Sequence, residues 1–256
     1  MSADTRPRFV VLGASNVSRD LRGIVARARG AQTAPVEILT AHGRGRSYGI
    51  PSRFLWSREL EGIDTCGLWA RLAARTAATS ALVADLGNDL VYGVAPGQIA
   101  DWIERVLDRL QAAEARSVVV GLPLAGLMQL GSFRFALARH AFFPGREIDL
   151  PRLVDAARTL NERLAAAVRS RGAAWIEPDV RWYGLDPIHF RQAARNSAWD
   201  SIFAPLSDTV RAQPWAHGER ALLASARPAA RRLFGREQRC AQPCVRFADG
   251  TTVSWY

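Results

Sequence analysis

The sequence alternates short apolar runs with segments of helical periodicity, and this alternation restricts the fold more than any other feature. The runs are largely apolar, with polar residues only at Glu37, Thr40 and Asp85, which is typical of strands buried on both faces of a sheet. They lie at Phe9–Gly13, Val36–Ala41, Ala81–Leu86, Val118–Leu122 and Ala174–Ile176. The segments with helical spacing lie between them, at Val17–Arg29, Leu68–Ala78, Ile99–Leu110 and Pro151–Gly172. Such alternation predicts an α/β fold, a three-layer α/β/α sandwich in which helices cover both faces of a mostly parallel sheet.

Two insertions and a tail depart from this pattern. The insertions, His42–Gly67 and Leu124–Leu150, are longer than a simple connection needs, and loops of this length usually carry function. The tail, Arg211–Tyr256, holds eight arginines against three acids, which is half of the net charge of +10. We therefore predict a main domain over residues 1–212 and an Arg-rich C-terminal extension over residues 213–256.

The basic residues are all of one kind. The 34 Lys and Arg positions are all arginine, and the chain has no lysine. This excludes Schiff-base enzymes, P-loop nucleotide-binding proteins and protein kinases, because each of these classes needs a lysine. An all-arginine set is more typical of a GC-rich genome than of a polyanion partner. Because the chain has no helix-turn-helix, zinc-finger or RNA-binding motif, we expect no nucleic-acid partner.

The three cysteines do not suit a disulfide-stapled secreted protein, because their number is odd and the chain is large. They are Cys66, Cys240 and Cys244, and the last two lack further ligands nearby, so we expect reduced thiols and no metal site. The first apolar run is too short for a signal peptide, and no stretch approaches the ~20 apolar residues of a membrane span. These features predict a cytoplasmic protein without a membrane span.

Four segments with chemically active residues each follow a predicted strand. They are Gly13–Asn16 with Ser15, the glycine-rich His42–Gly49, Leu86–Leu90 with Asn88, and Tyr183–Phe190 with Asp186 and His189. Taken singly, each has an ordinary structural explanation, such as a helix cap or an Asx turn. Together they are more informative, because the carboxyl ends of parallel strands meet at one edge of the sheet, where ligands bind.

The chemistry of these segments matches the needs of acyl transfer. Asp186 and His189 are three residues apart, which brings both side chains to one face if Pro187 begins a helical turn. A carboxylate that fixes one imidazole nitrogen leaves the other nitrogen to act as a general base. The serine, the asparagine amide and the glycine loop supply a nucleophile and oxyanion donors.

In these segments the chain resembles the SGNH (GDSL-type) hydrolase family, whose motifs occur in order from Phe9 to Arg195. The resemblance implies a flavodoxin-like sheet of about five strands and a catalytic domain that ends before the extension. It also implies that Ser15 is the nucleophile, Asp186 the orienting acid and His189 the base, with no metal or organic cofactor.

By the same resemblance, the oxyanion hole consists of the N–H groups of Ser15 and Gly45 and the side-chain amide of Asn88. Gly45 is preferred because the residues after it fit the family's Gly-x-Ser/Thr pattern, and Gly43 is the alternative. Two motifs differ from the family pattern. An alanine precedes the serine where the family usually has an aspartate, and Gly87 directly precedes Asn88 without an intervening residue.

We therefore predict a serine esterase that hydrolyses small-molecule carboxylic esters through an acyl-enzyme on Ser15. Two alternatives stay open. The first is an acyltransferase on the same scaffold, in which a sugar or another alcohol competes with water for the acyl group. The second is a non-catalytic α/β module that binds a phosphate or nucleotide at the helix N-terminus after the first strand. The second alternative gives no role to Asp186 and His189.

The remaining aromatic residues and histidines support only weaker expectations. The second insertion is either a lid over an apolar acyl pocket or a segment that merely packs onto the sheet. Its aromatic residues are Phe133, Phe135, Phe142 and Phe143, interleaved with Arg134, Arg139 and Arg146. We expect His42, His140 and His217 on the surface or in loops, with His42 also a candidate substrate contact.

Overall fold

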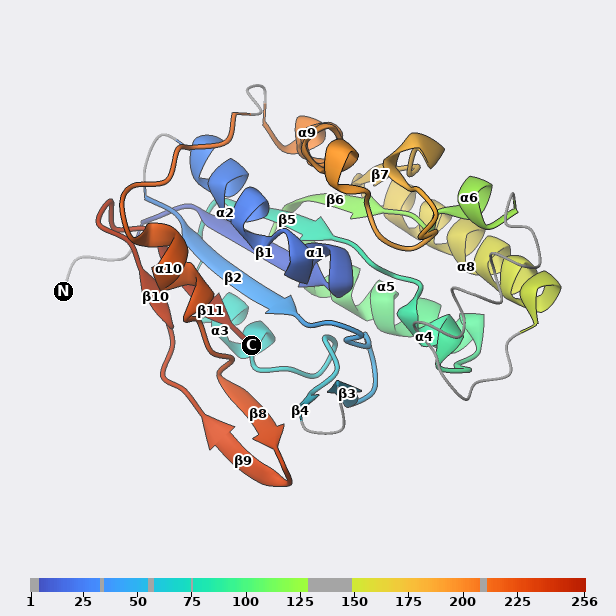
Figure 1. Cartoon of the computed structure of the whole chain (residues 1–256), viewed down its shortest axis with the longest axis horizontal. Helices are drawn as coiled ribbons and strands as arrows, with labels where there is room; N and C mark the ends of the chain where they lie inside the picture. Colours follow the sequence, from blue (N-terminus) through green and yellow to red (C-terminus); the bar gives the residue numbers. More distant parts are fainter. Residues whose placement is uncertain (1–4, 33–34, 55–57, 75, 129–148, 208–210) are drawn as a thin grey trace.

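The computed structural model describes residues 5–32, 35–54, 58–74, 76–128, 149–207 and 211–256. A seven-stranded sheet runs through its centre, with helices on both faces (Figure 1). In spatial order its strands are β10 (Val245–Arg246), β11 (Thr252–Trp255), β2 (Glu37–His42), β1 (Arg8–Gly13), β5 (Thr79–Val83), β6 (Arg116–Val120) and β7 (Ala174–Ile176). All neighbouring pairs are parallel except β10 and β11, which are antiparallel. The predicted α/β class with a mostly parallel sheet is confirmed.

Five of these strands are the predicted ones, in the flavodoxin-like order β2, β1, β5, β6, β7. The other two, β10 and β11, come from the extension and lengthen the sheet beside β2. Their sequences lack a continuous apolar run, since β10 has two residues and β11 alternates polar with apolar ones. Even so, Thr252 and Ser254 of β11 are buried, and the strand lies between β10 and β2 in the sheet.

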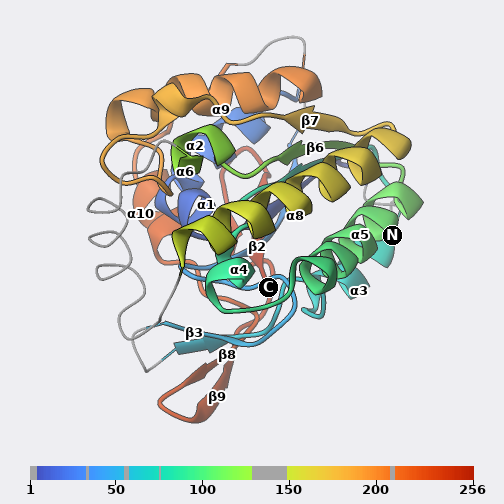
Figure 2. The same ribbon diagram turned by 90° about the vertical axis from the view of Figure 1, so that its right-hand side faces the viewer.

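Alternate residues of the central strand β1 pack into two separate cores. Phe9 and Val11 face one layer of helices, and Val10 and Leu12 face the other. The first layer contains α1 (Ser15–Arg19), α2 (Leu21–Gly30), α9 (Arg195–Phe203) and α10 (Glu219–Ala224), and the second contains α3 (Leu68–Ala73), α5 (Pro96–Ala112) and α8 (Leu150–Ser170). Figure 2 shows α2 and α9 on one side of the strands and α5 and α8 on the other.

Helix boundaries follow local sequence signals. The helix predicted over Val17–Arg29 begins at Ser15 and breaks at Asp20 into α1 and α2, since aspartate favours helix caps over helix interiors. Helix α5 begins at Pro96, whose missing N–H costs nothing in the first turn. The shorter elements are α4 (Asn88–Val91), α6 (Leu124–Met128), η1 (Val180–Trp182), η2 (Gln192–Ala194) and η3 (Ala204–Leu206).

A second sheet of four short antiparallel strands joins the first insertion to the extension. Its strands are β3 (Ser52–Phe54), β4 (Arg58–Leu60), β8 (Ala230–Leu233) and β9 (Arg236–Arg239). Strand β4 of the insertion pairs with β8 of the extension. The extension thus contributes strands to both sheets, and the domain boundary between residues 212 and 213 stays a prediction.

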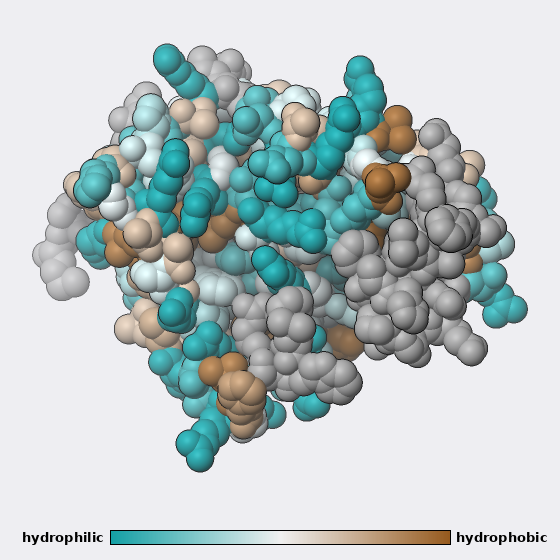
Figure 3. Space-filling model, in the orientation of Figure 1, coloured by the Kyte–Doolittle hydropathy of each residue, from teal (hydrophilic) through white to brown (hydrophobic). Residues whose placement is uncertain are grey.

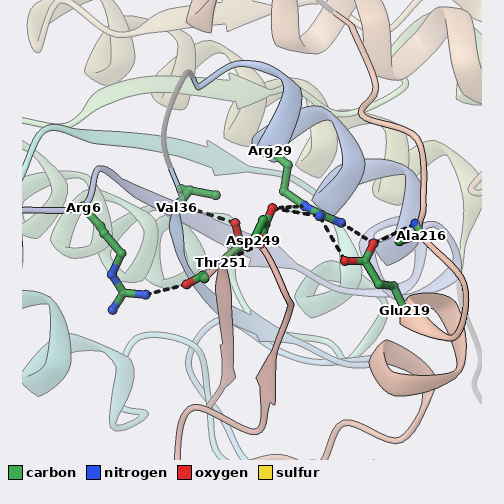
Figure 4. A network of polar contacts seen from close by, with 8 residues as sticks. Arg6, Arg29, Val36, Ala216, Glu219, Asp249 and Thr251 are labelled. Carbon is green, nitrogen blue, oxygen red and sulfur yellow. Dashed lines mark hydrogen bonds and ion pairs between the residues drawn. The ribbon is translucent and has the colours of Figure 1, made fainter.

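A buried arginine also fastens the extension to the main domain (Figure 4). Arg29 at the end of α2 donates to Glu219 Oε2 at 2.9 Å and to Asp249 Oδ2 at 2.8 Å. Its guanidinium carbon lies 4.7 Å from the centroid of the Phe247 ring. Hydrogen bonds from Arg29 hold the pKa of Glu219 below its ordinary value. Burial of the guanidinium is tolerated because carboxylates from the extension neutralise it.

The face that carries α1 and α2 is largely hydrophilic (Figure 3), in line with the arginine-rich composition. Some large apolar side chains are nevertheless exposed, such as Phe234 in the turn between β8 and β9, which is 78% exposed. Within the described ranges, no helix is both long enough and apolar enough to cross a bilayer.

Glu219→Gln removes one of the carboxylates that neutralise Arg29, and we expect it to lower the free energy of unfolding. Breaking a buried ion pair costs about 3–5 kcal/mol, and we expect about 2–3 kcal/mol here because Asp249 still faces the guanidinium. Urea denaturation followed by circular dichroism measures the change. The matched control is Glu237→Gln, whose ion pair with Arg239 is mostly exposed. The control should change stability by less than about 1 kcal/mol, and equal effects of both substitutions would contradict the prediction.

Candidate active site

Ser15 is the first residue of α1, two residues after the end of β1, and lies at the carboxyl edge of the sheet. The carboxylate of Asp85, which follows β5, holds this turn. It accepts hydrogen bonds from three N–H groups, those of Ala14 (2.8 Å), Asn16 (3.0 Å) and Val17 (3.2 Å). The N–H of Ser15 itself is not one of these three donors. Asp85 has φ +60°, a left-handed conformation that aspartate tolerates better than most residues.

Asp186 and His189 contact each other directly. Asp186 Oδ2 lies 2.6 Å from His189 Nδ1, and Oδ1 accepts hydrogen bonds from the N–H groups of Ile188 (3.0 Å) and His189 (3.1 Å). No helical turn forms at Pro187; the aspartate side chain organises an Asx-type turn instead. Burial raises the pKa of Asp186, but the hydrogen bonds from His189 and from the Ile188 N–H outweigh it and hold the pKa below its ordinary value.

Asn16 connects two turns: the serine turn, residues 14–17, which contains Ser15, and the histidine turn, residues 186–189, which contains His189. Its Nδ2 donates to the carbonyl oxygen of Ile188 at 3.1 Å, and its Oδ1 accepts from the N–H of Phe190 at 2.9 Å. Asn16 is adjacent to Ser15, and it binds the backbone on both sides of His189. The two turns are therefore held against each other by a side chain that is itself 8% exposed.

The glycine loop after β2 is bent at Gly45. Its φ of +67° is left-handed, and a Cβ there would lie 2.8 Å from the hydroxyl oxygen of Tyr92, so only glycine fits without strain. Tyr92 donates this hydroxyl proton to the carbonyl oxygen of Gly45 at 2.6 Å. Gly43, the alternative oxyanion residue, is not among the residues with positive φ.

Helix α4 holds the rest of this loop. Asn88, its first residue, donates from Nδ2 to the carbonyl oxygen of Arg46 at 3.3 Å. Asp89 is fully buried and accepts a hydrogen bond from the N–H of Tyr48 at 2.9 Å. Burial raises the pKa of Asp89. The structure thus brings Asn88 to the segment that contains Gly45.

An apolar cavity of about 100 Å³ opens beside Asn88, between the ends of β5 and β6. Its lining includes Leu86, Leu90, Val120, Leu122, Leu153 and Phe190. The aromatic residues and arginines expected to form a lid lie at positions 133–146, outside the described residues. Whether the second insertion covers the cavity therefore stays a prediction.

Sequence reasoning missed Asp85 and Asp89 and gave no role to Asn16. The sequence does contain a signal for Asp85: it is an acid that directly follows the apolar residues Leu82-Val-Ala. The expected surface or loop position of His42 is wrong, because His42 is the last residue of β2 and is 4% exposed. His217 is exposed, and His140 lies outside the described residues.

The cysteines of the chain are free thiols, with Cys66 buried and Cys240 and Cys244 partly exposed. Over the ranges that the structure describes, no cluster of three or more His, Cys, Asp or Glu side chains is arranged to hold a metal ion.

Asn16→Ala removes the acceptor of the Phe190 N–H and the donor to Ile188, so we expect the histidine turn to loosen. A hydrogen bond is worth about 1 kcal/mol, which corresponds to roughly fivefold faster amide exchange. Hydrogen–deuterium exchange of peptides covering residues 184–191 measures this, with peptides from α5 as the internal reference. Ser197→Ala, which removes a surface hydrogen bond within the α9 region, is the control. Unchanged exchange in the Asn16 variant would show that the two turns are held by other contacts.

No protein-family model matches the chain, and no curated protein matches it. Solved structures do match. The inhibitor-bound aryl esterase from M. smegmatis is 14% identical, with a TM-score of 0.50 over 78% of this chain and 97% of its own. TesA is 16% identical, with a TM-score of 0.47 over 78% and 98% of the two chains. AlinE4, an SGNH-hydrolase family esterase, is 13% identical, with a TM-score of 0.40 over 88% and 94%. The chain therefore has the fold of the M. smegmatis aryl esterase, in agreement with the fold that the resemblance to SGNH hydrolases implies.

Proposed function

We propose that this chain is a serine esterase in which Ser15 is the nucleophile, His189 the general base and Asp186 the residue that orients the imidazole. The observation that carries the proposal is the pair of hydrogen bonds that join Asn16 to the backbone on both sides of His189: Asn16 donates to Ile188, and the N–H of Phe190 donates to Asn16. Together with the 2.6 Å contact between Asp186 and His189, these bonds support a Ser–His–Asp arrangement. Esterases among the solved structures of similar fold are consistent with this reaction.

In the reaction, Ser15 Oγ attacks the carbonyl carbon of the ester while His189 Nε2 takes the hydroxyl proton. Asp186, bound to Nδ1, stabilises the imidazolium that results. When the tetrahedral intermediate collapses, the imidazolium gives its proton to the leaving oxygen, and the alcohol departs from the acyl-enzyme. Water then attacks the acyl carbon with His189 again as base, which releases the carboxylic acid and restores the Ser15 hydroxyl.

The oxyanion of the tetrahedral intermediate binds to the main-chain N–H groups of Ser15 and Gly45 and to the amide of Asn88. Asp85 supports the role of the first donor, because it accepts from the N–H groups of the residues flanking Ser15. The Asn88 amide has two N–H groups, and donation to Arg46 uses one of them. The second N–H donates to the oxyanion, and a donor fixed in this position stabilises the negative charge that develops on the oxygen.

The apolar cavity beside Asn88 supports a short apolar acyl group. Its volume is about 100 Å³. A cavity that holds benzene measures ~150 Å³, so the acyl chain that fits has only a few carbons. We propose small-molecule esters of short acyl chains as the substrates.

We also propose a cytoplasmic, reducing location. This proposal is based on the three free cysteines, an odd number in a chain whose core needs no disulfide staple.

Ser15→Ala removes the nucleophile, and we expect p-nitrophenyl acetate hydrolysis to fall by about 10³-fold or more. A fluorophosphonate probe followed by peptide mass spectrometry should label Ser15 in the wild type and leave the variant unlabelled. Asn88→Ala should still be labelled, with kcat lower by about 10²–10³-fold, because one oxyanion donor is lost. Ser197→Ala, at an exposed position on α9 that makes none of the site contacts described above, should behave as the wild type. Labelling of a different residue in Ser15→Ala would refute the assignment.

Asp186→Asn tests the orienting carboxylate. Because the pKa of Asp186 is held below its ordinary value, the carboxylate keeps its charge, and the stability it adds is lost only as the pH falls through that lowered pKa. An amide cannot stabilise the imidazolium, and this change in a Ser–His–Asp triad lowers kcat by about 10⁴-fold. We expect a large loss at every pH from about 5 to 9, because an aspartate whose pKa lies below its ordinary value stays charged throughout this range. A loss restricted to one end of this range would contradict the role given to Asp186.

A further inference from the structure

The last strand of the extension ends against the glycine loop. Strand β11 pairs in parallel with β2, and just beyond it the N–H of Tyr256 donates to the carbonyl oxygen of Thr40 at 2.8 Å. The extension therefore follows β2 to the carboxyl edge of the sheet, where the loop His42–Gly49 begins. Two residues at this end, Trp255 and Tyr256, contact that loop.

Trp255 contacts His42 in two ways. Its indole Nε1 donates to the His42 carbonyl oxygen at 2.9 Å, and the two rings stack with centroids 4.6 Å apart and 6° between their planes. His42 Nδ1 lies 3.0 Å from Ser18 Oγ, which donates to the carbonyl oxygen of Ala14 at 2.6 Å. Because Ala14 directly precedes Ser15, a continuous series of contacts runs from Trp255 to the nucleophile turn.

Arg46 provides the second connection, although it is charged and only 1% exposed. Its guanidinium donates to main-chain oxygens from three segments, those of Glu61 (3.0 Å), His42 (3.4 Å) and Tyr256. Its own carbonyl oxygen accepts from Asn88 Nδ2. Arg46 directly follows Gly45, and its carbonyl oxygen binds Asn88. The positions of both oxyanion donors therefore depend on a buried cation, and the extension supplies one of the hydrogen-bond acceptors of that cation.

These contacts suit positioning better than general packing. A buried guanidinium must keep its hydrogen-bond acceptors, because an unpaired buried charge is strongly destabilising. The acceptor from the extension is a main-chain oxygen, that of Tyr256. The position of the Arg46 guanidinium is therefore set by the backbone at the end of β11 and not by a mobile side chain. In an active site, a shift of ~1 Å can cost about 10²-fold in rate.

We propose that Trp255 and Arg46 are positioning residues, through which the end of β11 sets the geometry of the glycine loop and of the oxyanion donors Gly45 and Asn88. The extension is then part of the scaffold of the active site and not an appendage. This inference rests on the proposed esterase function and deepens it, because it gives residues 213–256 an effect on turnover.

Two substitutions of Trp255 separate its contacts. Trp255→Phe keeps a ring that can stack on His42 and loses the indole N–H, whereas Trp255→Leu loses both. With p-nitrophenyl acetate, we expect kcat to fall about tenfold in Trp255→Phe and about 10²-fold in Trp255→Leu, with KM within about twofold of the wild type. Partial retention by phenylalanine and an effect on kcat alone distinguish positioning from a purely structural role.

Val253→Ala is the matched control in the same strand. Val253 is 1% exposed and packs in the core, so its truncation lowers the melting temperature without touching the loop. Its kcat should stay within about twofold of the wild type below the melting transition. Phe234→Ala, in the exposed turn of the same extension, should change neither quantity. The proposal is overturned if Trp255→Leu keeps the wild-type kcat, or if it loses no more activity than Val253→Ala.

Hydrogen–deuterium exchange gives a readout that needs no substrate. In Trp255→Leu, peptides covering residues 42–49 should exchange at least about fivefold faster, while peptides from α5 stay unchanged. A wild type that hydrolyses no ester would refute the proposed function, and the exchange data would still decide whether β11 orders the loop. An active wild type with unchanged kcat and exchange in Trp255→Leu would refute this inference alone.

Discussion

The candidate site depends on the carboxylate of Asp85. Buried N–H groups have to be paired, and one carboxylate can satisfy several of them at once. Asp85 takes N–H groups of the turn around Ser15 and also the Nδ2 group of Asn16, at 2.7 Å. Asn16, oriented in this way, reaches the backbone on both sides of His189. One acid at the end of β5 thereby links the nucleophile segment to the segment of the base.

The parallel sheet explains why segments so far apart in sequence meet at all. The loops after β1, β2 and β5 leave the sheet at the same edge, because these strands run in the same direction. The buried strands supply a rigid base, since their side chains pack into cores on both faces. The hydrogen bonds of Asp85, Asn16 and Tyr92 then set the finer positions of the loops.

The sequence predicts those features that depend on local patterns. The five central strands are visible because burial on both faces favours largely apolar runs. The contact between Asp186 and His189 agrees with their spacing, although an Asx-type turn and not a helical one produces it. Strands β10 and β11 are not visible, since they are short and depend on pairing with β2. The bond between Asp85 and Asn16 joins residues whose separation follows no local period, so no pattern within either segment announces it.

Arginine contributes to this structure in a way that composition alone does not reveal. A guanidinium carries five donors in a rigid fork, so one buried arginine can join several chain segments, whereas the ammonium of lysine acts as a single point of charge. Arg29 binds Glu219 and Asp249, and Arg46 binds main-chain oxygens at both ends of a loop and at Tyr256. Strand β11 is thus fastened before its start, at Asp249, by Arg29 and after its end, at Tyr256, by Arg46. A strand held at both ends has little freedom to shift. A strand that positions a catalytic loop needs this restriction, because any movement of the strand would also move the loop.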